Sequence, residues 1–200
     1  MGKFLVRLGL AVVSALVIGY PLTVWYANVS LTLDQTLLVS LFPAIGLVAF
    51  TIMYLHILGR PFKHMLEHYV DFDIFERISS YVVLVAVLLH PALRTVFLLM
   101  NDISISFTLP LVLGIIGFFM LITYDLGKAF IRSQWVREHW WLIDVVSTLG
   151  FYVIWVHSLM LGSELQTGFL RAVWIFFGIS ALLASAYTFL YQSAATEPKR

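Results

Sequence analysis

Apolar residues occur in six long runs that are separated by short polar connections. We place these runs at residues 8–26, 36–58, 78–100, 107–126, 141–161 and 169–191. Each run has about the 20 residues that a helix needs to cross a hydrocarbon layer of about 30 Å. The runs are too long and too uniformly apolar for barrel strands, and a backbone in lipid must satisfy its own hydrogen bonds, so we expect helices. The pattern predicts an all-α polytopic membrane protein built as a six-helix transmembrane bundle.

Composition supports this class and narrows the chemistry. The 200 residues are 61% hydrophobic and 12% charged, and none is cysteine. Without cysteine, the chain can hold neither a disulfide nor a thiolate-bound iron–sulfur cluster, and it cannot attach haem covalently. We find no repeat of fixed period and treat residues 1–200 as a single domain. Membrane lipid is the expected surrounding, and we expect no nucleic-acid partner.

The distribution of basic residues predicts the orientation of the spans. With the amino terminus in the cytoplasm, only Arg94 and Arg171 lie towards the outside. The other basic residues then all lie on the inner side: Lys3, Arg7, Arg60, Lys63, Arg77, Lys128, Arg132, Arg137, Lys199 and Arg200. Because positive charge concentrates on the cytoplasmic side of membrane proteins, we expect both termini in the cytoplasm. We expect the membrane to be the inner membrane of a bacterium.

Two histidines lie deep within apolar runs. His90 follows about 12 residues of the third run, and His157 follows about 16 of the fifth. In the expected orientation these two runs are parallel, so at 1.5 Å per residue both imidazoles lie at similar depth in the outer half of the bilayer. An imidazole in hydrocarbon needs a partner, and each ring could offer one nitrogen to a single iron. The alternative is that each histidine is structural and bonds to a neighbouring helix.

The sequence around these histidines resembles the ferric reductase-like transmembrane domain, which includes the haem-binding membrane subunit of periplasmic methionine sulfoxide reductase systems. The resemblance covers the second to the sixth run and depends on LVAVLLHPAL at His90 and on the tryptophan-led run from Trp140 to His157. It implies one haem b per chain, with His90 and His157 as its axial ligands. Many members of the superfamily carry a second, inner histidine pair. Thirteen residues before His90 and His157 this chain instead has Arg77 and Asp144, and we predict that these two form an ion pair, with separate interfacial roles as the alternative.

Several other polar residues have candidate roles. Outward-facing haem propionates would need cationic partners, and Arg94 and Arg171 could supply them, although lipid headgroups could also attract both. His64, Glu67 and His68 form an HxxEH pattern on a predicted short interfacial helix. We interpret this pattern as a solvated polar face, because no third metal ligand is evident. His56 and His139 could line an inner quinone or flavin site, or simply be interfacial.

These observations give two functional hypotheses. The first is a b-type haem oxidoreductase subunit that passes electrons across the membrane to an outer acceptor, either a ferric chelate or a periplasmic oxidoreductase. The sequence has no glycine-rich nucleotide motif and no room for a flavin domain. The electrons would therefore come from a soluble flavin reductase or from membrane quinol. The second hypothesis is a haem-free membrane subunit or small-solute carrier that keeps the fold.

Overall fold

The computed structural model describes residues 2–29 and 36–192, and within these ranges the chain forms helices and no strand. The six helices that are long and apolar enough to cross a membrane are α1 (Gly2–Asn28), α2 (Thr36–Gly59), α4 (Phe72–Met100), α5 (Leu109–Ala129), α7 (Trp140–Leu161) and α8 (Gly168–Tyr187). They match the six predicted runs, so the all-α class is confirmed.

Short helices mark the two ends of the bundle. At one end lie η1 (Arg60–Phe62), α3 (Lys63–Leu66), α6 (Gln134–Glu138) and η3 (Thr188–Gln192), and we name this the α3/α6 end. The opposite end carries η2 (Ser163–Leu165) and the α4–α5 connection, and we name it the η2 end. The predicted interfacial helix after α2 is shorter than its apolar spacing suggests. After Leu66 the chain continues in turns, which include a bond from the Tyr69 amide to the Leu66 carbonyl.

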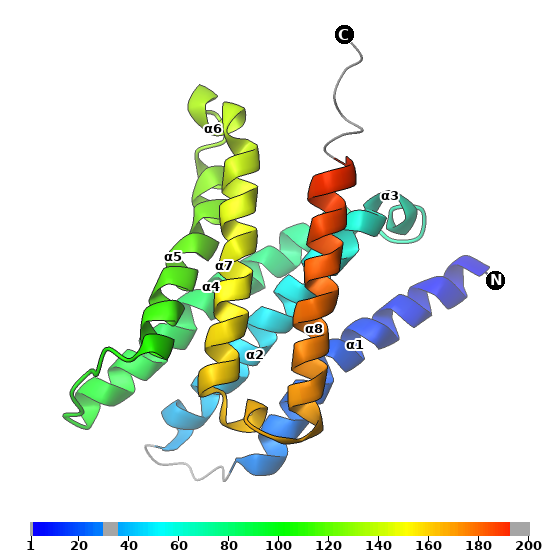
Figure 1. Ribbon diagram of the computed structural model, residues 1–200. Coiled ribbons are helices and arrows are strands. Elements are labelled where there is room, and N and C mark those ends of the chain that lie inside the picture. Colours follow the sequence, from blue (N-terminus) through cyan, green and yellow to red (C-terminus); the bar gives the residue numbers. More distant parts are fainter. Residues whose placement is uncertain (1, 30–35, 193–200) are drawn as a thin grey trace.

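The long helices associate mainly as two close pairs, α2 with α4 and α5 with α7. The helix α8 packs on α2 and also contacts α7, and α1 packs on α2. Figure 1 shows α7 standing between α5 and α8, with α1 reaching away towards the amino terminus. In contrast, α4 and α7 make few direct contacts with each other.

A stack of aromatic rings forms the centre of the core. Phe50 of α2 lies between Phe151 of α7, at a ring-centroid distance of 4.7 Å, and Trp174 of α8, at 4.3 Å. All three side chains are only 1% exposed. Trp174 also donates its indole N–H to the Ser158 hydroxyl at 2.8 Å. Burying rings of this size contributes strongly to stability, so the stack holds α2, α7 and α8 together.

Apolar side chains cover the outward faces of α1, α4 and α5. Examples are Leu16, Tyr81, Leu99 and Phe119, each more than half exposed. A soluble protein does not carry apolar surface on this scale, whereas lipid tails solvate it readily. The chain is therefore an integral membrane protein.

The two helix pairs have corresponding residues at a constant spacing of 68. This spacing relates the first residues of α4 and α7, Phe72 and Trp140, and it relates glycines at equivalent places in α2 and α5. The corresponding positions are Gly46 and Gly114, Gly59 and Gly127, Phe72 and Trp140, Glu76 and Asp144, and Ser79 and Ser147. These five correspondences relate the α2/α4 pair to the α5/α7 pair.

Candidate functional site

His90 is tied to the neighbouring helix through one ring nitrogen. Its Nδ1 lies 2.7 Å from the backbone carbonyl oxygen of Phe42 on α2. The ring rests against Gly46, one turn further along α2, where an added Cβ would lie only 2.9 Å from Nδ1. Glycine at this position therefore lets the imidazole lie against the backbone of α2.

His157 repeats this arrangement in the other helix pair. Its Nδ1 lies 2.7 Å from the carbonyl oxygen of Pro110 at the start of α5. Its ring rests against Gly114, where a Cβ would lie 2.8 Å from Nδ1 and 2.7 Å from Cε1. The carbonyl and the glycine are again four residues apart. The two histidine sites are thus counterparts, and a shift of one residue in α7 relates His157 to His90 at a spacing of 67.

These bonds fix one nitrogen of each ring. A carbonyl oxygen can only accept, so Nδ1 carries a proton in each histidine, and the Nε2 of a neutral ring keeps its lone pair. Neither Nε2 has a hydrogen-bond partner among the described residues. No fully buried side-chain nitrogen or oxygen atom of these residues lacks a partner, so neither Nε2 is fully buried. Each Nε2 is therefore open and available to a ligand.

The imidazoles of His90 and His157 lie within range of an electrostatic interaction, although α4 and α7 make few direct contacts. Two neutral imidazoles with Nδ1 bonded to backbone carbonyls and Nε2 free have the donor set and outer bonds typical of axial haem ligands. The residues present therefore fit a haem iron ligated by His90 and His157.

The two arginines predicted to contact propionates differ in their surroundings. Arg94 is exposed one turn beyond His90, with its guanidinium 5.4 Å from the centroid of the Phe42 ring. The same Phe42 supplies the carbonyl that bonds His90. Arg171 is half-buried and donates to the Leu165 carbonyl at 2.9 Å, which fastens η2 to α8. Arg94 is thus beside the histidine site, and Arg171 has a structural bond.

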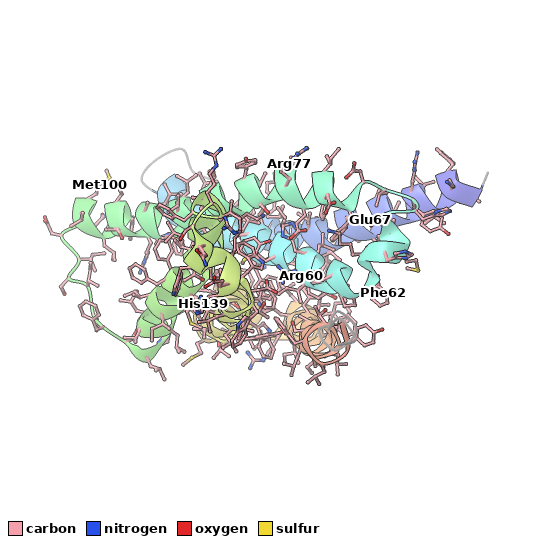
Figure 2. The ribbon with its side chains drawn as sticks, turned by 90° about the horizontal axis from the view of Figure 1, so that it is seen from above. Arg60, Phe62, Glu67, Arg77, Met100 and His139 are labelled. Atoms are coloured by element: carbon pink, nitrogen blue, oxygen red, sulfur yellow. The ribbon has the colours of Figure 1, made fainter. Side chains whose placement is uncertain are left out.

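The predicted Arg77–Asp144 ion pair is corrected by the structure. Asp144 pairs with Arg60, whose Nη1 lies 2.6 Å from Oδ1, and the two side chains are 24% and 21% exposed. Arg77 is exposed on α4, and Figure 2 shows it at the edge of the molecule while Arg60 lies towards the middle. Arg77 follows Glu76 directly, so the helical turn of about 100° per residue carries its side chain away from the face that Glu76 presents to the bundle.

The Arg60–Asp144 pair belongs to a polar network at the α3/α6 end. The Arg60 guanidinium also lies over the Tyr124 ring, 5.8 Å from its centroid, and the Tyr124 hydroxyl donates to Glu76 at 3.4 Å. We name these four residues the polar tie. Each contact in it joins one helix pair to the other. Arg60 begins η1, directly after α2, and Glu76 belongs to α4, while Tyr124 and Asp144 belong to the α5/α7 pair.

A cavity of about 90 Å³ lies beneath the polar tie, between α2, α4, α5 and α7. Its polar lining includes His56, Glu76, Tyr124 and Asp125, and its apolar wall extends to Val87, one turn from His90. This volume is well below the 300–1,000 Å³ of a typical cofactor pocket. The cavity as it stands has the size of a small molecule.

The remaining histidines have partners of their own or lie at the surface. His56 bonds the Ser79 hydroxyl at 2.6 Å, and His139 bonds the Trp135 carbonyl at 2.9 Å while it stacks on that indole. His64 and His68 line an open surface depression with Glu67. No group of three His, Asp or Glu side chains suited to a metal ion occurs within residues 2–29 and 36–192.

Comparison of the chain with protein-family models, curated proteins and solved structures returns no match. The site must therefore be interpreted from its own geometry. That geometry adds residues that sequence reasoning missed, namely Gly46, Gly114 and the polar tie. The two glycines were detectable in the sequence. Gly46 lies in the apolar run before that of His90, Gly114 lies in the run before that of His157, and the two glycines are 68 residues apart.

Proposed function

We propose that the chain is a b-type haem protein that moves electrons across a membrane, with one haem per chain held between His90 and His157. The observation that carries this proposal is the paired arrangement of the two imidazoles. In both, Nδ1 donates to a backbone carbonyl and Nε2 is left open. Similarity of the surrounding residues to the ferric reductase-like transmembrane domain supports the same proposal.

The haem would supply a one-electron carrier, and the protein residues would bind and orient it. The carbonyls of Phe42 and Pro110 fix the imidazole planes and raise the basicity of Nε2. Arg94 would neutralise a propionate from the face beside Phe42. For Arg171 the bond to Leu165 makes the structural role the stronger hypothesis.

The basic residues support an orientation with the α3/α6 end in the cytoplasm, because Arg60, Lys63, Lys128, Arg132 and Arg137 lie at that end. Both termini would then be cytoplasmic, in the inner membrane of a bacterium. The histidines would lie nearer the outer side, where a ferric chelate or a periplasmic oxidoreductase could accept electrons.

The electron donor would act from the α3/α6 end. A soluble flavin reductase could dock on the cytoplasmic surface, or membrane quinol could approach between the helices. The cavity of about 90 Å³ between the helices lies on the second route and is smaller than a typical cofactor pocket. Val87, which lines this cavity, is one helical turn from His90, so electrons from flavin or quinol at the cavity would have a short distance to travel to the histidine.

Spectroscopy of the purified protein tests this proposal. Ligation by two histidines predicts a low-spin ferric electron paramagnetic resonance (EPR) signal, a Soret band and sharp α and β bands after reduction. His90→Ala and His157→Ala should abolish these features, whereas His64→Ala and His68→Ala, in the surface depression, should leave them unchanged. Spectra that depend on His64 and His68 instead would refute the assignment of the ligands.

A second candidate is a haem-free membrane subunit or small-solute carrier. The polar cavity favours it, because Glu76 and Asp125 line a small space inside an apolar bundle. Polar groups of this kind commonly mark solute or ion paths. A colourless protein from cells supplied with haem would favour this candidate over the first.

A further inference from the structure

The separation of His90 from His157 depends on how the two helix pairs meet. Each histidine is bonded within its own pair, His90 to α2 and His157 to α5. The two histidine-bearing helices make few contacts with each other. Any rotation of one pair against the other would therefore change the distance and angle between the two imidazoles, while each imidazole kept its own bonds.

Two groups of side-chain contacts join the pairs directly, and α8, which packs on both α2 and α7, connects them as well. The first is the stack of Phe50 on Phe151, with ring planes only 14° apart. Phe50 follows Gly46 by four residues, so the stack lies about one helical turn, or 6 Å, from the level of the histidines. A stack of two flat rings so close to the histidines restrains their separation more than it restrains the angle between the pairs.

The second group is the polar tie at the α3/α6 end. Arg60 follows Phe50 by ten residues, which is about 15 Å along the helix. A contact at this distance from the stack is an effective angular restraint, because a displacement of about 1 Å there corresponds to a rotation of only about 4°. The histidines lie only about 6 Å from the stack, so the same rotation moves them by about 0.4 Å. This displacement is within the tolerance of about 0.5 Å for a preorganised site.

We propose that Arg60, Asp144, Tyr124 and Glu76 are positioning residues, which set the relation of His90 to His157 by locking the two helix pairs together at the far end of the bundle. This inference builds on the proposed function for its consequence at the haem, but the locking itself can be measured without haem. The polar tie joins η1, which directly follows α2, to α5 and α7 and joins α5 to α4, through one ion pair, one cation–π contact and one hydrogen bond.

The absence of cysteine makes distance measurement between introduced labels direct. We would place nitroxide labels at Leu99→Cys and Leu161→Cys, which are exposed sites on α4 and α7 and so report between the pairs. A control combination, Leu109→Cys with Leu161→Cys, joins α5 to α7 within one pair. Leu99 lies about 20 Å from the level of the stack, so a rotation of about 10° would move it by about 3 Å.

The variants are Arg60→Met, Asp144→Leu and the charge-swapped combination of Arg60→Asp with Asp144→Arg. We expect both single variants to shift or broaden the distance between the pairs by about 3 Å, and the swapped combination to restore it. Tyr124→Phe, which removes only one hydroxyl group, should produce a smaller change of the same kind. The matched control is Lys63→Met, which breaks the 2.6 Å ion pair of Lys63 with Asp73 at the same end but within one pair.

An unchanged distance between the pairs in both single variants and in Tyr124→Phe would overturn the inference, as would an equal change in the control distance within one pair. In haem-loaded protein the single variants should also shift the largest g-value of the low-spin EPR signal, which responds to the angle between the imidazole planes, and the swapped variant should recover it. If no haem binds but the label distances move as expected, the positioning role stands and the proposed function fails. If haem binds normally and neither distances nor g-values move, the positioning role fails and the proposed function stands.

Discussion

The imidazole of His90 lies directly against Gly46, and the same relation joins His157 to Gly114 in the second helix pair. In both places the glycine is one turn from the carbonyl that accepts the Nδ1 proton. The protein thus uses one local design twice, with a small residue and a free carbonyl on the preceding span holding an imidazole on the next.

Gly46→Ala and Gly114→Ala should each displace the imidazole that rests on the glycine, because the new Cβ would lie within 3 Å of the ring. We expect haem affinity to fall about 10- to 100-fold, the usual effect of losing outer bonds at a metal ligand. Titration of the apoprotein with haem measures this. The control is Gly19→Ala in α1, where nothing lies within 4 Å of the added Cβ, and binding should be unchanged.

Arg60→Met and Asp144→Leu should each lower the free energy of unfolding by about 1–3 kcal/mol, between the values for exposed and for buried ion pairs. The double variant should lose less than the sum, since neither charge is left alone. Denaturant unfolding in detergent, analysed as a double-mutant cycle, gives the coupling energy. The exposed pair of Lys63 and Asp73 should give about 0–1 kcal/mol in the same cycle. Additive losses for Arg60 and Asp144 would contradict the ion pair.

Arg94→Gln should lower the midpoint potential of the haem. Reduction adds one negative charge, and loss of a neighbouring cation makes that charge less favourable by about 1 kcal/mol, which is about 40 mV for one electron. Potentiometric titration monitored in the α band measures the shift. Arg171→Gln should leave the potential nearly unchanged and instead loosen η2, because Arg171 bonds the Leu165 carbonyl. Equal shifts in both variants would assign Arg171 to the propionates as well.

Trp174→Phe should destabilise the bundle, because it removes the indole N–H bond to Ser158 and part of the ring that stacks on Phe50. We expect a loss of about 1–3 kcal/mol in the free energy of unfolding. Trp141→Phe is the matched control, since Trp141 is 66% exposed and should change stability by less than about 0.5 kcal/mol. Similar losses in both would show that the stack is not the centre of the core.

The fold was largely predictable, because the lengths and positions of the apolar runs almost completely determine the number and positions of transmembrane helices. The helix boundaries agree within a few residues, apart from α1 and α4, which both begin six residues before the predicted runs at Leu8 and Ile78. Charged residues at those positions, such as Arg7 and Arg77, interrupt the apolar pattern without interrupting the helix. Hydropathy therefore locates the part of a helix in lipid better than its ends.

The partner of Asp144 was not predictable from spacing. Arg77 and Asp144 occupy matching depths, but the choice between Arg60 and Arg77 depends on which face each helix turns to the bundle, and this is set by packing. The hydrogen-bond partners of His90 and His157 were not predictable from the sequence for the same reason. Carbonyl partners leave no mark in a sequence, and only the two glycines beneath the rings could have indicated them.

The haem content of the purified protein tests the central claim most directly. Pyridine haemochrome analysis against protein concentration should give a ratio near one for the parent chain and near zero for His90→Ala and for His157→Ala, with membrane assembly of the variants verified by gel filtration. A haem-to-protein ratio near zero or near two in the parent chain would contradict a single haem held between His90 and His157. A ratio that stays the same when either histidine is replaced would contradict it as well.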